Sequence, residues 1–100
     1  MDNYGDTALH WAADKGKDAV ATQLLQAKAN PNAADNDGYT PLHWAARYGH
    51  AVVVDVLLQA KANPAAVNKD GKTPAQLAEQ YGRTELAARL RQAASGAASQ

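Results

Sequence analysis

Hydrophobic and polar positions along this chain follow one pattern that recurs every 33 residues. The recurrence divides the chain after Met1 into three parts of equal length, 2–34, 35–67 and 68–100, which we call units 1, 2 and 3. The first two units are identical at 20 of 33 positions, and the second and third at 11. A period of this length predicts supersecondary units that bury their hydrophobic faces by stacking on one another.

Each unit carries the signals of a turn followed by two short helices. In unit 2, Asp37-Gly38 is a turn dipeptide, and Thr40-Pro41 suits the cap and the first position of a helix. Gly49 can end that helix in the left-handed conformation. A second helix is predicted in each unit, over roughly 18–27, 51–60 and 84–93.

The residue three positions after the capping threonine is His10, His43 or Gln76. In unit 3 the segment Thr73-Pro74-Ala75-Gln76 is a capping box, in which the glutamine side chain returns a hydrogen bond to the threonine backbone. We therefore predict that the two histidines are neutral capping groups.

The same positions make the chain resemble the ankyrin repeat family. The pattern that carries the resemblance runs from Asp35 to His50 and reads D-x-x-G-x-T-P-L-H-x-A-A-x-x-G-H. The resemblance covers essentially the whole chain and implies a hairpin plus two antiparallel helices in each unit. The implied fold class is an all-α repeat, an α-solenoid forming a single domain over 1–100. It also implies a role in binding other proteins, without naming the partner.

Unit 3 differs from unit 2 in a way that is typical of a C-terminal cap. Terminal repeats of a stack need a polar outer face. Unit 3 has Glu85, Arg89 and Arg91 at positions where unit 2 has two valines and a leucine, so we expect these side chains to face away from the stack. After Ala93 the chain lacks bulky side chains, and 94–100 is expected to fray.

Lys28 and Lys61 follow the second helix at a position where ankyrin repeats usually carry glycine. A left-handed conformation would cost each lysine about 1 kcal/mol relative to glycine. If the loop has that conformation, Lys28→Gly and Lys61→Gly should each stabilise the fold.

Composition narrows the classes of function. The chain is 46% hydrophobic and has no apolar run long enough to span a membrane. Ten basic and ten acidic residues give a formal net charge of zero, which argues against a surface for nucleic acid or anionic membrane. Cysteine is absent and no leader precedes unit 1, so a cytoplasmic protein that is a monomer by itself is expected.

Large side chains on the first helices are the best candidates for a contact surface. At about 100° per residue, Leu42, Ala45 and Ala46 form the stripe that packs inward. Trp44 and Tyr48 then lie together on the opposite face, since they are four residues apart.

The equivalent pairs are Trp11 with Lys15 in unit 1 and Leu77 with Tyr81 in unit 3, which predicts a continuous strip across the units. Two interpretations stay open. The rings fill gaps between adjacent helices, or they anchor a partner, since aromatic and arginine side chains often dominate the energetics of protein interfaces.

The family resemblance adds the turn tips and the exposed side of the first helix, which partners of ankyrin repeats usually contact. Tyr39, Trp44, Arg47 and Tyr48 are the strongest candidates. The predicted partner-binding residues are Tyr4, Asp6, Trp11, Asp14, Lys15, Asn36, Tyr39, Trp44, Arg47, Tyr48, Lys69, Lys72, Gln80 and Tyr81.

The chain has no motif for catalysis, a metal or a cofactor. It lacks an HExxH motif, a paired cysteine motif and a glycine-rich phosphate loop. Its only serines, Ser95 and Ser99, stand in the tail, outside any nucleophile elbow. The sequence thus predicts a non-catalytic module that binds another protein. The alternatives are a stability scaffold, designed or duplicated, without an evolved partner, and a regulatory or targeting segment of a larger protein.

Overall fold

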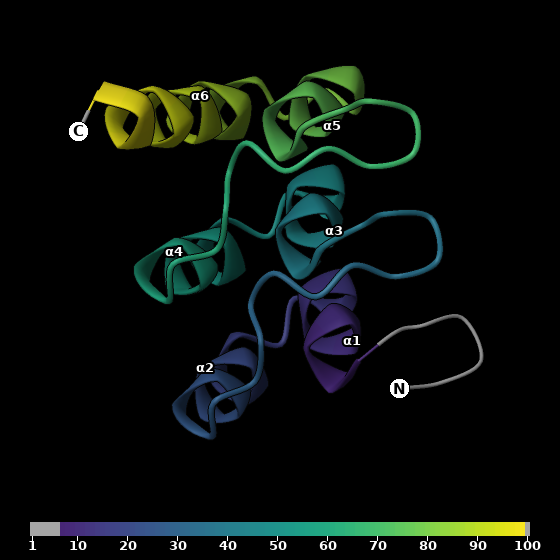
Figure 1. The fold of residues 1–100 in the computed structure, drawn as a ribbon, viewed down its shortest axis with the longest axis vertical. Coiled ribbons are helices and arrows are strands. Elements are labelled where there is room, and N and C mark those ends of the chain that lie inside the picture. Colours follow the sequence, from purple (N-terminus) through teal and green to yellow (C-terminus); the bar gives the residue numbers. More distant parts are fainter. Residues whose placement is uncertain (1–6, 100) are drawn as a thin grey trace.

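The computed structural model describes residues 7–99, and every regular element in that part of the chain is a helix. Figure 1 shows α1, α3 and α5 stacked in one row and α2, α4 and α6 in a second row. Within the first row, α1 packs on α3 and α3 on α5. The predicted all-α repeat stack is confirmed. The helices are α1 (Ala8–Lys15), α2 (Asp18–Gln26), α3 (Pro41–Tyr48), α4 (Ala51–Gln59), α5 (Pro74–Gln80) and α6 (Thr84–Ser99).

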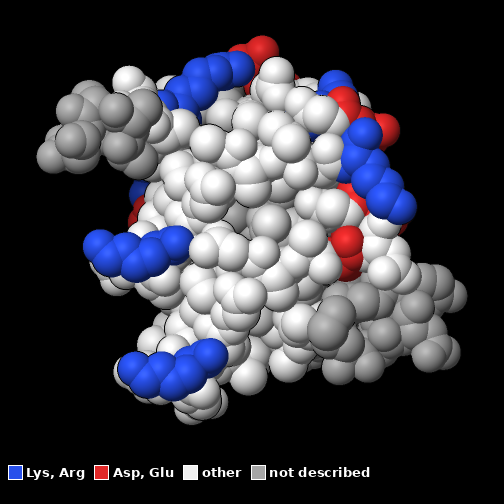
Figure 2. All heavy atoms as spheres, in the orientation of Figure 1, with Lys and Arg blue, Asp and Glu red and all other residues white. Residues whose placement is uncertain are grey.

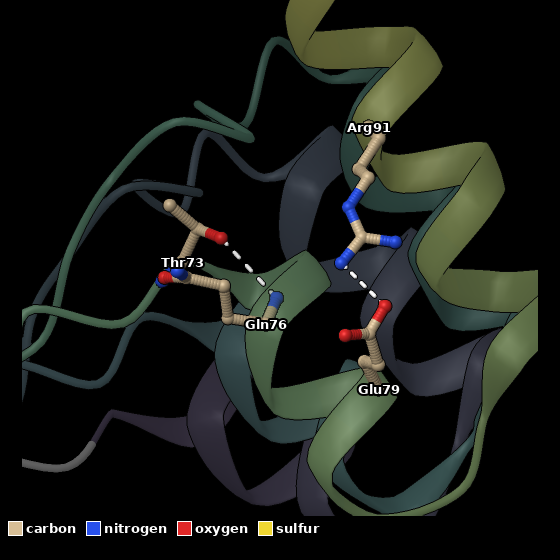
Figure 3. Close-up of polar contacts among 4 residues, drawn as sticks. All are labelled: Thr73, Gln76, Glu79 and Arg91. Atoms are coloured by element: carbon tan, nitrogen blue, oxygen red, sulfur yellow. Dashed lines mark hydrogen bonds and ion pairs between the residues drawn. The ribbon is translucent and has the colours of Figure 1, made fainter.

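A threonine caps the first helix of every unit, as predicted. In unit 2, Oγ1 of Thr40 accepts a hydrogen bond from the N–H of His43 at 3.3 Å, and the N–H of Thr40 donates to Nδ1 of His43 at 3.1 Å. Unit 1 has the same reciprocal pair, and unit 3 builds it from Thr73 and Gln76 (Figure 3). The capping role of the two histidines is confirmed.

The second ring nitrogen of each histidine makes a bond that was not predicted. Nε2 of His10 lies 2.8 Å from the carbonyl oxygen of Tyr39, and Nε2 of His43 lies 2.9 Å from that of Lys72. A carbonyl oxygen can only accept, so Nε2 carries the hydrogen in both rings. Each imidazole therefore joins its own unit to the next one.

Two glycines permit a close approach between successive units. Gly16 and Gly49 end α1 and α3 in the left-handed conformation, with φ of 70° and 74°. A Cβ atom on Gly16 would lie 2.7 Å from Nδ1 of His50, and one on Gly49 would lie 2.9 Å from Cδ of Arg83. Both backbone conformation and space therefore require glycine here.

The loops that follow α2 and α4 are left-handed at their lysines, as considered from the sequence. Lys28 has a φ of 73° and Lys61 a φ of 74°. The two loops are also joined, because Oδ1 of Asn32 accepts from the N–H of Asn63 at 2.6 Å. Both lysines therefore adopt a backbone conformation that favours glycine. They do so in loops that are held together by a hydrogen bond between units.

The tips that project from units 2 and 3 are tight turns, and the described residues form no strands there. In unit 2 the N–H of Asp35 donates to the carbonyl oxygen of Tyr39 at 2.8 Å. Oδ1 of Asp35 accepts from the N–H groups of Asp37 and Tyr39, both at 2.9 Å. Asn68 repeats this arrangement in unit 3. One short polar side chain at the base of each loop thus fixes the shape of the tip.

The core lies between the two rows of helices. Leu42, Ala45 and Ala46 of α3 are fully buried, so the predicted inward stripe is confirmed. Val54 and Leu57 of α4 fill the interior from the second row. Alternation of small alanine with larger side chains lets successive helices interdigitate closely.

The expected outward direction of two side chains in unit 3 is wrong. Glu85 and Arg89 line a hollow of about 350 Å³ together with Gly49 and Ala51 of unit 2. Arg89 also forms an ion pair with Asp55 of α4. These positions face the preceding unit, as do the equivalent valines of α4, which line hollows against unit 1. Glu85 and Arg89, which stand where unit 2 has valines, therefore lie at the junction with unit 2.

Arg91 differs from Glu85 and Arg89 in the contact that it makes. Its guanidinium pairs with Glu79 of α5, with Nη2 2.6 Å from Oε2 (Figure 3). The equivalent residue in unit 2, Leu58, faces unit 3, where it shares a hollow with Ala93. The idea of unit 3 as a C-terminal cap stays a prediction, and it now depends on Arg91.

Helix α6 continues to Ser99, into the segment that was expected to fray, and Gln100 lies outside the described residues; the fraying stays a prediction. Alanine has the highest helix propensity of all residues, so an alanine-rich segment can extend a helix without large side chains to pack.

Candidate functional site

Five of the predicted partner-binding side chains gather beside the tip of unit 2. They are Tyr39, Trp44, Arg47, Tyr48 and Tyr81, and we call them the Arg47 cluster. Tyr39 ends the tip, the next three lie on α3, and Tyr81 directly follows α5. The residues of α3 share one face because they are three and four positions apart. The cluster therefore combines a tip with the first helices of units 2 and 3.

Contacts between rings order the cluster. Trp44 and Tyr48 stack with an interplanar angle of 7° and centroids 6.1 Å apart. The ring of Tyr39 lies tilted 4.6 Å from that of Trp44. Nε1 of Trp44 donates to Oδ2 of Asp35 at 3.1 Å. The carboxylate that shapes the tip thus also orients the indole.

Arg47 stands among three of these rings. Its Cζ atom lies 4.8 Å from the ring centroid of Tyr81, 5.4 Å from that of Tyr48 and 5.7 Å from that of Trp44. All three distances are within the range of cation–π attraction. The contact with Tyr81 crosses from unit 2 to unit 3, so the cluster bridges two units.

Polar contacts of Arg47 are few. Nη1 donates to the hydroxyl oxygen of Tyr39 at 3.3 Å, while Nε is buried without a hydrogen-bond partner. No described carboxylate lies within 4.0 Å of its guanidinium. Burial opposes the charge of Arg47, but its pKa is raised overall by charge interactions with Tyr48, Tyr39 and Tyr81, which ionise at a lower pH than arginine, and by the hydrogen bond with Tyr39. The guanidinium is therefore a permanent cation in a largely aromatic setting.

Exposure differs among the predicted rings and leaves both interpretations open. Trp11, Tyr48 and Tyr81 are 50%, 39% and 42% exposed, so a large part of each side chain is free to contact a partner. Trp44 is half-buried, and its position fits both interpretations. The predicted strip is wrong at Leu77, which is only 2% exposed. The helical angle of Leu77 gives the direction of its side chain, but it does not show whether neighbouring side chains cover it.

The other predicted residues are distributed more widely. Asp14 and Lys15 form an ion pair at 3.9 Å on α1. Among the described residues, no ring or cation–π contact joins unit 1 to the Arg47 cluster. Tyr4 and Asp6 lie outside the described residues. The remaining predicted positions are exposed or half-exposed and comprise Asn36, Lys69, Lys72 and Gln80.

Asp35 is the one member of the site that the sequence reasoning missed. Asp35 is not among the predicted partner-binding residues, yet its carboxylate accepts hydrogen bonds from the backbone of the tip and from the indole of Trp44. A signal was present, since Asp2, Asp35 and Asn68 occupy the same position of the three units. Each of these side chains can accept hydrogen bonds from the backbone two residues on.

Charge is unevenly distributed over the surface. Figure 2 shows one broad face that is nearly free of charged side chains, which lie along its edges. In the described part of the chain, no group of three or more His, Cys, Asp or Glu side chains could hold a metal ion. The helices of this part include none with the length and apolar character needed to cross a membrane.

Comparison with known families identifies the units. The family model described as ankyrin repeats (3 copies) matches residues 22–98, and the model described as ankyrin repeat matches residues 4–36. The first match alone includes all five residues of the Arg47 cluster. No curated protein matched the chain.

Proposed function

The chain belongs to the ankyrin repeat family, and from this premise we propose that it binds another protein through the Arg47 cluster and the adjacent turn tips, without catalysing a reaction. Ankyrin repeats are generally protein-interaction modules, and the family fold is non-catalytic. The proposal assigns this general role to one surface of this chain. It further places the protein in the cytoplasm as a monomer that binds neither nucleic acid nor membrane.

The exposure of Tyr48 and Tyr81 within an ordered cluster carries the proposal. Both rings touch Arg47, and Tyr48 also stacks on Trp44. Rings that are already held in place lose little conformational entropy when a partner covers them. Tyrosine, tryptophan and arginine are also the residue types enriched among the energetic anchors of interfaces.

A stability scaffold without an evolved partner is the competing function. The 20 identities between units 1 and 2 favour it, because duplication or design produces such similarity. A regulatory or targeting segment of a larger protein is a third candidate. Of the three candidate functions, only the proposed protein-binding module requires the exposed rings to contact another protein.

Affinity capture from a lysate of the source cells tests the proposal. The bait proteins are the wild type, a Tyr48→Ser/Tyr81→Ser variant and a control variant, Val52→Ser/Val67→Ser. The control removes two side chains that are 58% and 57% exposed and lie outside the cluster. A protein that is retained by the wild type and the control but lost by the tyrosine variant supports the proposal. Equal capture by all three baits contradicts it.

A further inference from the structure

We infer that the Arg47 cluster recognises a side-chain carboxylate of the partner, on an aspartate or glutamate that stands next to an apolar residue. The inference rests on the proposed function and adds the chemistry of the ligand to it. Three properties of the cluster support it: the charge of Arg47, which no described carboxylate pairs, its incomplete hydrogen bonding within the described part of the chain, and the exposed rings of Tyr48 and Tyr81.

The charge of Arg47 has no counter-ion in the described part of the chain. Arg89 is paired with Asp55 and Arg91 with Glu79, although both arginines lie on the exposed surface of α6. Arg47 is more buried than either, and its hydrogen bond and cation–π contacts with described residues are to one hydroxyl group and three rings. A carboxylate from a partner would supply an opposite charge at a place where solvent screens it less than at Arg89 or Arg91.

The guanidinium of Arg47 also retains hydrogen-bonding capacity. Of its three nitrogen atoms, Nη1 donates to Tyr39 and Nε is buried without a partner, while Nη2 donates to no described residue. Hydrogen bonds from a guanidinium to a carboxylate are shorter and stronger than neutral ones. Because the surrounding rings already fix the side chain, a carboxylate would meet a donor that is held in place.

The rings beside Arg47 define what must flank the carboxylate. The centroids of Tyr81 and Tyr48 lie 4.8 and 5.4 Å from Cζ, and both rings are exposed. An apolar side chain next to the acidic residue can cover these rings while the carboxylate reaches Arg47. A chain of phosphates fits less well, because the protein has zero formal net charge and this cluster contains a single cation.

Selection from a phage-displayed library of random peptides tests the inference. The peptides are fused through their C-terminal ends, so any carboxylate they offer to the protein comes from a side chain. We expect selection on the wild type to enrich aspartate or glutamate beside an apolar residue. Selection on Arg47→Gln should lose this acidic preference, whereas the matched control Arg91→Gln should keep it. An acidic preference that persists in Arg47→Gln, or that is absent from the wild type, overturns the inference.

Affinities of one selected peptide separate the inference from the proposed function. Replacing its acidic residue with the corresponding amide should weaken binding to the wild type about tenfold, and binding to Arg47→Gln by much less. Added salt should weaken the acidic peptide more than the amide peptide, a comparison that requires no variant of the protein. If Tyr48→Ser/Tyr81→Ser abolishes binding while the acid-to-amide change has no effect, the cluster is a binding surface and the carboxylate inference fails.

Discussion

The imidazole of His43 in unit 2 donates a hydrogen bond from Nε2 to the carbonyl oxygen of Lys72 in unit 3, at 2.9 Å. The other nitrogen, Nδ1, accepts from the N–H of Thr40. A ring that donates on one side and accepts on the other must be neutral, because a second proton on Nδ1 would oppose the N–H of Thr40.

The neutral state of His43 makes stability depend on pH. Burial lowers the pKa of His43, although the contact with Lys72 acts in the opposite direction. The unfolded chain, with an ordinary histidine pKa of about 6.5, therefore binds more protons just below that pH than the folded chain does. The contribution is complete above pH 6.5 and is lost as the pH falls towards the lower pKa of the folded state.

Urea denaturation at pH 7.5 and at pH 5 measures this effect, and His43→Gln is the comparison. Glutamine can cap the helix, as Gln76 does in unit 3, but it does not titrate. We expect the wild type to lose more unfolding free energy between the two pH values than the variant loses. Equal losses would show that other groups account for the pH dependence.

Lys28→Gly and Lys61→Gly should each raise the free energy of unfolding by about 1 kcal/mol, because glycine adopts the observed left-handed conformation without steric cost. Lys28→Ala and Lys61→Ala are the matched controls, since alanine keeps the cost and removes only the charged chain. Thermal denaturation measures all four variants. Equal stabilisation by alanine and glycine would assign the effect to charge or side chain instead of φ.

Gly16→Ala should destabilise the protein more than Gly82→Ala. Both residues have a positive φ, at 70° and 81°, so a left-handed alanine costs about 1 kcal/mol in each case. Only at Gly16 does the new methyl group also collide with the ring of His50. Removing that ring in Gly16→Ala/His50→Ala should make the double variant more stable than the sum of the single effects. Additive effects in denaturant titrations would contradict the steric explanation.

Tyr48→Ser should destabilise the fold much less than Leu42→Ala. Leu42 is fully buried, and removing a core leucine typically costs about 2–5 kcal/mol. Tyr48 loses mainly its stacking with Trp44 and its contact with Arg47, each on the order of 1 kcal/mol or less. Chemical denaturation of both variants measures the difference. A comparable loss for Tyr48→Ser would identify the ring as part of the core and not as a free surface.

Signals within one unit were sufficient to predict the helix caps and the buried helix face, whereas the stacked fold was predicted from the 33-residue recurrence and the family resemblance. The capping threonines and the inward stripe around Leu42 depend on local backbone geometry or helical spacing. The left-handed conformation of Lys28 and Lys61 was only considered as a condition, because ankyrin repeats usually carry glycine there. The same spacing placed Trp44 and Tyr48 on one surface, and the family resemblance added Arg47. Residues that act within their own turn or helix can therefore be assigned from the sequence.

Contacts that side chains make with a neighbouring unit could not be predicted in the same way. The bond from His43 to Lys72 and the reversed directions of Glu85 and Arg89 depend on how far and at what angle one unit lies from the next. Leu77 is buried for the same reason, since neighbouring side chains decide whether an outward position reaches solvent. A helical wheel for one unit contains no information on that distance or angle.

The contact between Arg47 and Tyr81 determines which junction between units a bound partner would stabilise. In a stack, stability is the sum of each unit and its junctions with immediate neighbours. A partner that covers this contact would clamp units 2 and 3 together and leave the junction between units 1 and 2 unchanged. Binding would then divide the molecule into a clamped pair and a first unit that still opens independently. Amide hydrogen exchange would slow in α3 and α5 and stay unchanged in α2.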